Sequence, residues 1–123
     1  MFLTGLIHVN VRTHRLAELI EFYRDVLGMQ QGARPNFSFS GAWMYVGPHP
    51  VVHLVLVDEA PKPGESLRLQ HFAFSGQDEQ AFCRHLDHLQ VSYRVGRLED
   101  FKIVQINVDD PDGNHIHVDF PAV

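Results

Sequence analysis

The feature that most constrains this chain is an internal repeat marked by histidines. The runs "LIHVNV" and "LQHFAF" are short, alternate apolar side chains and carry a histidine third, and these histidines, His8 and His71, lie 63 positions apart. His53 and His117 lie near the middle of the last apolar run of each half and are 64 positions apart. Because two independent pairs give nearly the same period, we expect two copies of one structural unit.

Each histidine-bearing run is followed by a helical pattern and then by alternating runs. Apolar side chains recur every three or four residues over 16–27, where Gly28 is a candidate C-terminal cap, and more sparsely over 82–89, where Asp78 is a candidate N-cap. Beyond each helix the period changes to two, which predicts strands over 42–47, 51–57, 101–108 and 114–120. Segments 30–40 and 91–97 are ambiguous. The sequence therefore predicts an α+β fold in which each half is a strand, a helix, and two or three strands.

The boundary between the halves is predicted from composition. The segment "DEAPKPGES" carries two prolines and a glycine, as short linkers do. We expect one domain, with module 1 over about residues 1–58, a linker over about 59–66 and module 2 over about 67–123.

Charge and cysteine content narrow the classes of function. Fifteen acidic residues against ten basic ones give a net charge of −5, with no basic cluster for phosphates, so a nucleic-acid partner is not expected. No run approaches the roughly 18 apolar residues of a membrane span. The one cysteine, Cys83, forms no internal disulfide and is expected to be a structural thiol. We expect a cytoplasmic protein without a membrane partner.

The histidines share one face of their strands. In all four strands the alternation places bulky apolar side chains, such as Ile7 and Val9 in the first, on the face opposite the histidine. Three explanations are open: a metal centre of neutral imidazoles, separate core histidines, or a histidine-lined cavity for an organic ligand. Because four histidines occupy repeat-related positions, the metal centre or a shared polar cleft is favoured.

The last strand extends this polar face. At a period of two, His115, His117 and Asp119 lie on one side, with Ile116 and Val118 on the other. Asp119 lies about 7 Å beyond His117 at roughly 3.4 Å per residue, so it is a candidate partner that orients His117 and a poor substitute ligand. His115 is a candidate to line the cleft. The four other histidines are expected to face solvent: His14, His49, His85 and His88.

Four segments together carry a family resemblance. The stretches "IHVNV", "EFYRDVLGM", "QHFAF" and "DPDGNHIHV" resemble the glyoxalase, bleomycin-resistance and extradiol-dioxygenase superfamily, also called vicinal oxygen chelate proteins, over essentially the whole chain. The resemblance implies two βαβββ modules that form a U-shaped mixed sheet around a central cleft with a divalent metal ion. It also implies a homodimer and places ligands at His8, His53, His71 and His117.

This chain departs from the family pattern at two ligand positions. Family enzymes commonly have a glutamate where His117 stands, and glyoxalases have another where His53 stands. An all-imidazole site favours a divalent transition metal ion (Fe, Ni, Co or Zn) over magnesium. We expect His8, His71 and His117 to be the main ligands, and His53 to be a fourth ligand or the general base.

A loop in the first half is a candidate substrate site. The segment "RPNFSFSGAWMYVG" contains one guanidinium and four aromatic side chains: Arg34, Phe37, Phe39, Trp43 and Tyr45. They could wall a pocket for an aromatic or conjugated substrate with an acidic group, or the loop could simply pack its own aromatics onto the sheet. Asn10, which shares the face of His8, could orient a ligand or fill the cleft.

The resemblance and the histidines together predict a class of chemistry. We expect a metal-dependent enzyme that chelates two neighbouring oxygens of a small-molecule substrate and stabilises an enediolate or related anion. Glyoxalase-like lyase or isomerase chemistry is the first hypothesis. The alternatives are an extradiol-type dioxygenase acting on a catechol-like substrate, and a non-catalytic binding protein similar to bleomycin-resistance proteins.

Overall fold

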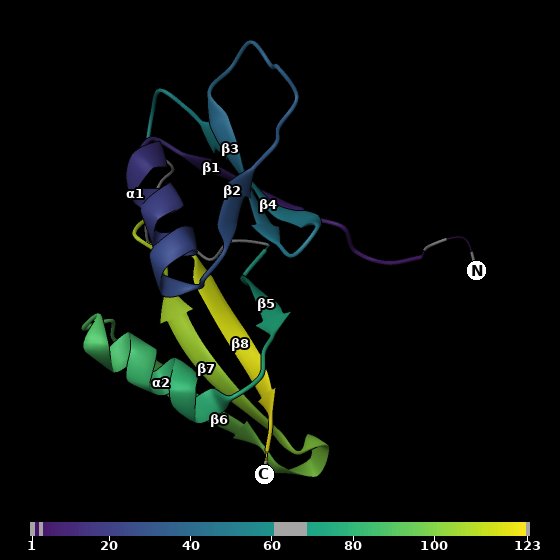
Figure 1. The fold of residues 1–123 in the computed structure, drawn as a ribbon, viewed down its shortest axis with the longest axis vertical. Coiled ribbons are helices and arrows are strands. Elements are labelled where there is room, and N and C mark those ends of the chain that lie inside the picture. Colours follow the sequence, from purple (N-terminus) through teal and green to yellow (C-terminus); the bar gives the residue numbers. More distant parts are fainter. Residues whose placement is uncertain (1, 3, 61–68, 123) are drawn as a thin grey trace. The chain divides into compact units, whose positions relative to one another are not determined.

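The computed structural model of the chain describes residues 2, 4–60 and 69–122. The chain divides into two compact units, residues 1–62 and 63–123 (Figure 1). Most of the predicted linker, at 61–66, lies outside the described residues. None of the helices in the described segments is long and apolar enough to cross a membrane.

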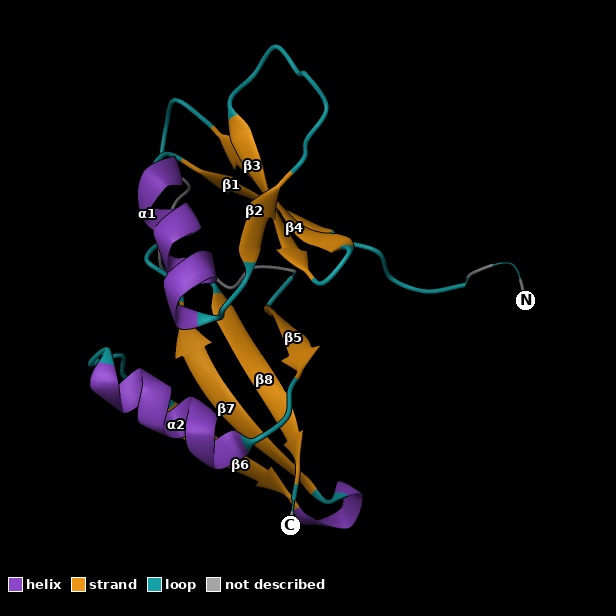
Figure 2. Cartoon of the chain, in the orientation of Figure 1, coloured by secondary structure: helices purple, strands orange, loops and turns teal. Residues whose placement is uncertain are grey.

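The two units have the same order of elements (Figure 2). The first unit contains β1 (Val9–Thr13), α1 (Leu16–Glu21) with a π-helical continuation (Phe22–Val26), β2 (Gln30–Gly32), β3 (Gly41–Val46) and β4 (His49–Leu56). The second unit contains β5 (His71–Ser75), α2 (Glu79–His88), β6 (Arg94–Leu98), a 3-10 turn (Glu99–Phe101), β7 (Ile103–Asp109) and β8 (His115–Pro121). The α+β fold with two βαβββ modules is thereby confirmed, and the two ambiguous segments contain β2 and β6.

Each unit forms a four-stranded mixed sheet. The strand orders are β1-β4-β3-β2 and β5-β8-β7-β6. The first and last strands of each unit pair in parallel, and the other pairs are antiparallel. The last strand of each unit therefore has a neighbour on both sides, and this places His53 and His117 in the interior of their sheets.

The first helix covers one face of its sheet. Leu19, Tyr23 and Val26 are buried, as are Val52 and Leu54 on the facing side of β4. Gly28 ends the helix with φ +76°, in the left-handed region that glycine adopts without strain, so the predicted cap is correct. The second half of the helix is π-helical, a difference from the regular α-helix that spacing alone predicted.

The second unit repeats this packing with fewer apolar contacts from its helix. Asp78 caps α2, because its Oδ1 accepts a hydrogen bond from the Ala81 amide at 3.0 Å, as predicted. Leu86 is fully buried, and the Phe82 ring lies 5.6 Å from the Phe120 ring, centroid to centroid. Ile116, on the same face of β8 as Phe120, is also fully buried. The helix therefore covers the apolar face and leaves the histidine face uncovered.

A tight turn joins β7 to β8 and fixes the start of the histidine strand. Asp110 is 4% exposed, and its Oδ1 accepts hydrogen bonds from the backbone amides of Asp112 at 3.0 Å and Asn114 at 2.9 Å. Its Oδ2 accepts a third from the Asn114 side chain at 2.8 Å, and Gly113 takes a φ of +84°. The segment "DPDGN" thus has a structural role, since it sets the position at which His115 enters β8.

Two expectations for the N-terminal run are wrong. Strand β1 begins at Val9, so His8 lies one residue before it, although the alternation predicted a strand from residue 6. Ile7 was expected to be buried against the helix but is 74% exposed, and Leu6 is 87% exposed. Pairing with β4 starts only at Val9 and Val52, so the preceding residues are not held on the sheet by a ladder.

Candidate functional site

Three imidazoles gather on the polar face of the second sheet. His71 pairs with His115 across β5 and β8, and His117 lies two residues further along β8. The His71 ring lies 5.0 Å from the His115 ring and 4.9 Å from the His117 ring, and the latter two are 6.1 Å apart, all between centroids. His117 is buried, His115 is half-buried and His71 is exposed, so the group opens to solvent at His71.

Each of these three rings has one nitrogen held by a side-chain oxygen. His117 Nδ1 lies 2.5 Å from Asp119 Oδ1, and His71 Nδ1 lies 2.7 Å from Gln70 Oε1. In the third ring, His115 Nε2 lies 2.8 Å from Asn107 Oδ1. Since carboxylate and amide oxygens only accept, each ring donates an N–H on that side, and in a neutral imidazole the other nitrogen then carries the lone pair. This is the arrangement that orients metal-ligating histidines.

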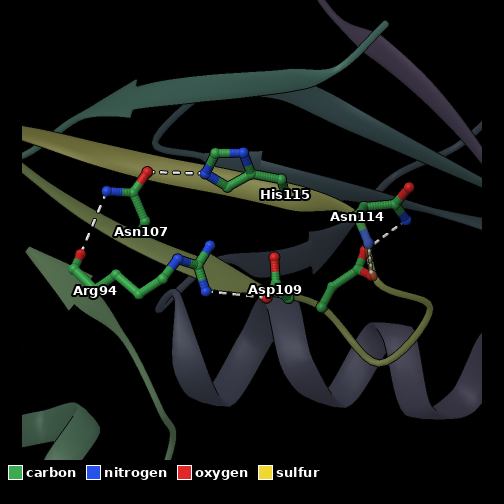
Figure 3. A network of polar contacts seen from close by, with 6 residues as sticks. Arg94, Asn107, Asp109, Asn114 and His115 are labelled. Carbon is green, nitrogen blue, oxygen red and sulfur yellow. Dashed lines mark hydrogen bonds and ion pairs between the residues drawn. The ribbon is translucent and has the colours of Figure 1, made fainter. Parts of the chain in front are cut away.

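A wider network sets the Asn107 amide (Figure 3). Its Nδ2 donates to the Arg94 carbonyl at 3.3 Å and to the Gln105 carbonyl at 3.4 Å, so its Oδ1 faces His115. Arg94 in turn pairs with Asp109 at 3.1 Å. Burial, with further contributions from His71 and Arg94, lowers the pKa of His115 below its ordinary value of 6.5. At neutral pH this ring is therefore neutral, with its lone pair on Nδ1.

The first unit presents its histidines differently, in a stack of rings. The His53 ring lies between His8, at 3.8 Å and 10° between planes, and Trp43, at 4.0 Å and 11°. His53 Nε2 donates to the Pro50 carbonyl at 2.9 Å, so its lone pair is on Nδ1. Burial, assisted by electrostatic interaction with His8 and Arg34, lowers the pKa of His53 below 6.5.

The stack limits what the first pair can ligate. An imidazole binds a metal in the plane of its ring, so two nearly parallel rings 3.8 Å apart do not point at one ion as they stand. Within residues 4–60 and 69–122, no three His, Cys, Asp or Glu side chains already converge on a common centre. Imidazole nitrogens are nevertheless donors of the kind that transition ions bind, and in His71, His115 and His117 one ring nitrogen is already held by a side-chain oxygen.

In the aromatic loop, residues 34–47, the side chains pack on one another, and the guanidinium of Arg34 is the cation that a ligand could meet. Phe37 and Phe39 stack at 4.9 Å, and the Arg34 guanidinium lies 4.9 Å and 5.1 Å from their ring centroids. Arg34 Nη2 also donates to the Phe39 carbonyl at 2.9 Å, and a side chain at Gly41 would collide with it. In the described part of the chain Arg34 forms no ion pair, and both phenyl rings are more than 40% exposed.

The other predicted substrate residues occupy the same sheet face. The Trp43 ring lies 6.5 Å from the Phe37 ring, centroid to centroid, and is tilted by 52° to it, so the loop borders the stack of His8, His53 and Trp43 without extending it. Tyr45 donates its hydroxyl to the Ala33 carbonyl at 2.6 Å, which ties it to the loop. Asn10 is exposed and pairs in register with His53.

The remaining titratable side chains fit simpler roles. The four histidines expected to face solvent are exposed: His14, His49, His85 and His88. Burial raises the pKa of the half-buried Cys83 thiol, which agrees with a structural cysteine and not with a nucleophile.

Sequence reasoning missed three oxygens that hold the rings. They belong to Gln70, Asn107 and the Pro50 backbone. For Asn107 a signal existed, because polar side chains alternate with valine and isoleucine along β7, which extends the polar face of β8. Gln70 precedes its strand and Pro50 acts through its carbonyl, so no side-chain pattern marked either.

Comparison with known proteins gives the family. Residues 5–118 match the model of the Glyoxalase/Bleomycin resistance protein/Dioxygenase superfamily. The chain belongs to this superfamily. A superfamily relative from Arabidopsis thaliana, named Glyoxylase I 4, is 27% identical over 125 residues, which cover 96% of this chain and 71% of that protein.

Solved structures of other proteins share the fold of this chain. A glyoxalase family protein from Bacillus anthracis has a TM-score of 0.82 at 21% identity, covering 98% of both chains. Lactoylglutathione lyase from Agrobacterium tumefaciens has a TM-score of 0.73 at 15% identity, covering 98% of this chain and 96% of that one. An antibiotic-binding protein from a Streptomyces species has a TM-score of 0.75 at 22% identity and covers 99% of both. At these identities the likeness is one of fold, and the superfamily includes enzymes as well as binding proteins.

Proposed function

We propose that the protein is a divalent-metal-dependent enzyme of the superfamily that acts on two neighbouring oxygens of a small substrate by glyoxalase-like lyase or isomerase chemistry. The observation that carries the proposal is the Asp119 carboxylate on His117 Nδ1. A buried imidazole fixed in this way keeps its Nε2 lone pair for a ligand, as in carboxylate–histidine–metal sites.

The proposed ligands are His8, His71 and His117, and the ion is Fe, Ni, Co or Zn. When bound, such an ion supplies Lewis acidity that stabilises negative charge on the substrate oxygens. Asp119 holds His117, and Gln70 holds His71, so both rings are oriented before the ion arrives. An all-imidazole set leaves the charge of the ion undiminished, which compensates for the missing carboxylate ligand.

We assign His53 the role of general base. Its Nε2–H is committed to the Pro50 carbonyl, and its plane is held between His8 and Trp43, so Nδ1 is the nitrogen that can accept a proton. A base that removes a proton next to a carbonyl must be rigid and unprotonated, and the stack supplies both properties.

The proposed substrate surface is the aromatic loop. Phe37, Phe39 and Trp43 offer ring faces to a planar group, and the guanidinium of Arg34 offers its remaining N–H donors to an acidic group. Asn10 and Tyr45 border this surface, Asn10 as a candidate to orient a substrate oxygen. A small acidic substrate with a planar portion fits these residues.

The test is metal-dependent proton exchange. The protein loaded with each metal in turn is incubated in D₂O with small α-hydroxyketones, and loss of the C–H signal next to the carbonyl is followed by NMR. We expect exchange with wild type and with the control His88→Ala, which alters an exposed histidine on α2. His53→Ala should abolish exchange while keeping the metal. Exchange that is equal in wild type and His53→Ala would contradict the assignment.

A binding protein is the second candidate, favoured by the exposed, self-supporting aromatic loop. Phe37, Phe39 and Arg34 hold one another without any ligand, so the surface is preformed for a planar, acidic small molecule. Binding of such a molecule with equal affinity before and after chelation of metal, together with no exchange, would favour this function.

The proposal includes a homodimer in the cytoplasm. The side chains of Leu6 and Ile7 are 87% and 74% exposed within one chain, which is unusual for large aliphatic residues and suits burial against a second copy. Light scattering should give twice the chain mass. Substituting both residues with serine should shift the molecules toward monomer.

A further inference from the structure

We propose that the second unit carries a row of side chains that binds a neutral, hydroxylated part of the substrate, with Gln105 as the residue that selects it. The row crosses the sheet in one register, and its members are Ser75 on β5, Asp119 on β8, Gln105 on β7 and Gly96 on β6. The inference rests on the proposed function only in taking the histidine face of this sheet as the one that meets the substrate.

The members of this row lie on the same face as the histidines. Asp119 shares a strand and a face with His117, to which it bonds, and residues paired in register point to the same side of a sheet. The surroundings of Gly96 show the same for Gln105, because a Cβ added at Gly96 would lie 3.6 Å from Gln105 Oε1. Ile106, next to Gln105 along β7, is fully buried on the opposite face.

The polar groups of the row are not used up by the protein. Gln105 is half-buried, yet within the described segments neither its side-chain amide nor the Ser75 hydroxyl has a hydrogen-bond partner. The Asp119 carboxylate holds His117 through Oδ1, which leaves Oδ2 to accept from a ligand. An amide and a hydroxyl both donate and accept, whereas a carboxylate only accepts. Together they match ligand hydroxyls, which also donate and accept.

The charges around the row favour a neutral ligand group. A hydroxyl can donate to the Asp119 carboxylate, whereas an acidic group would be repelled by it. The guanidinium of Arg94 is held by Asp109 at 3.1 Å. In-register side chains on neighbouring antiparallel strands have Cβ atoms about 4.5–5.5 Å apart, so a diol can donate one hydroxyl to Asp119 and bond through the other to Gln105. The acidic group of the proposed substrate is left to Arg34 in the first unit.

The internal repeat shows that the fold does not require this row. At the offset of 64, Asp119 corresponds to Val55 and Gln105 to Gly41, and these two are again paired in register. The space over Gly41 is taken by Arg34, since a Cβ added at Gly41 would lie 2.9 Å from Arg34 Nη2. The first unit therefore has an apolar side chain and a guanidinium where the second has a carboxylate and an amide, and the two select different ligand groups.

The experiment is an NMR titration of the ¹⁵N-labelled full chain with two uncharged probes. Erythrulose carries a diol beside its ketone, and 1-hydroxybutan-2-one has the same carbon chain without that diol. We expect erythrulose to shift the side-chain amide signal of Gln105, which is identified by its loss in Gln105→Leu. Erythrulose should also bind roughly 3–10-fold more tightly than the other probe, as one hydrogen bond allows. Gln105→Leu should remove this preference, and the control Gln80→Leu, which alters an exposed glutamine of α2, should keep it.

A second variant and the exchange assay separate this inference from the proposed function. Gly96→Val places methyl groups beside Gln105 and suits a strand, so it should remove the preference in a chain that circular dichroism shows to be folded. Equal affinity of wild type for both probes, or a preference that survives in Gln105→Leu, would overturn the inference and leave the proposed function standing. If the preference depends on Gln105 but wild type exchanges no proton with any metal, the row stands and the proposed function fails.

Discussion

The two units place histidines at equivalent positions but surround them with different side chains. In the first unit the neighbours of His53 are stacked rings, and in the second each histidine bonds to a side-chain oxygen. In the first sheet His53 is paired in register with Trp43 on the neighbouring strand, and in the second sheet His117 is paired in register with Asn107. Both pairs of positions are related by the offset of 64. Trp43 stacks on His53 and restrains the plane of its ring, whereas Asn107 bonds to His115 and Asp119 bonds to His117. The duplicated fold thus provides one scaffold, on which aromatic rings stack on His53 in the first unit and side-chain oxygens bond to His115 and His117 in the second.

The largest effect should come from the two cores, since each unit buries a leucine completely. Leu54→Ala in the first unit and Leu86→Ala in the second each remove a fully buried side chain. Each should lower the free energy of unfolding by about 2–5 kcal/mol, through lost burial and the cavity left behind. Denaturant unfolding measures both. A cost below about 1 kcal/mol for either would show that its unit is loosely packed around that leucine.

The next effect concerns the carboxylate that distinguishes the second unit. Asp119→Asn should weaken metal binding roughly 10–100-fold, because a neutral amide orients His117 less strongly and does not raise its basicity. Metal competition with a chromogenic chelator measures the affinity. Asp100→Asn removes the same charge from an exposed residue and should leave the affinity unchanged. Equal weakening in both variants would mean that net charge, and not orientation, is responsible.

The stack of the first unit should have a smaller, measurable energy. A double-mutant cycle of Trp43→Leu and His53→Leu should give a coupling of about 0.5–1.5 kcal/mol, the range for stacked aromatic pairs. Thermal or denaturant unfolding of the four proteins supplies the values. A coupling indistinguishable from zero would remove the stack as the restraint on His53.

The smallest effect is a shift of a titration midpoint. Trp43 is the single tryptophan and lies on His53, so its fluorescence should change as that imidazole gains a proton. Burial, with His8 and Arg34 nearby, lowers the pKa of His53, so the midpoint should fall below 6.5. Since the unfolded chain takes up this proton at higher pH than the folded one, the contribution of His53 to stability is lost as pH falls below about 6.5. A midpoint at or above 6.5, or the same titration in His53→Phe, would contradict this.

The sequence predicted the fold because the repeat and the change of period are physical consequences of duplicated βαβββ units. Gly28 and Asp78 marked helix ends through their conformational preferences, and both predictions are confirmed. The π-helical turn was not predictable, since α- and π-helical residues bury similar apolar positions. Ile7 was misassigned because alternation indicates which side a residue faces only where a neighbouring strand pairs with it.

The candidate site could be predicted only where its residues lie on one strand. The closeness of Asp119 to His117 followed from a period of two. The stacking of His53 on Trp43 depends on register between β3 and β4, and the partner of His115 depends on register between β7 and β8. Sequence patterns within a single strand do not contain that register, so the aromatic and amide surroundings appeared only in the structure.

The most direct test of the central claim, that the histidine faces serve a transition-metal centre, is the metal content of the full chain after equilibrium dialysis against equal concentrations of Fe²⁺, Co²⁺, Ni²⁺ and Zn²⁺. We expect one bound ion per chain and loss of that ion in His117→Ala. A chain that retains no ion under these conditions, or one that retains it unchanged after His117→Ala, would contradict the account.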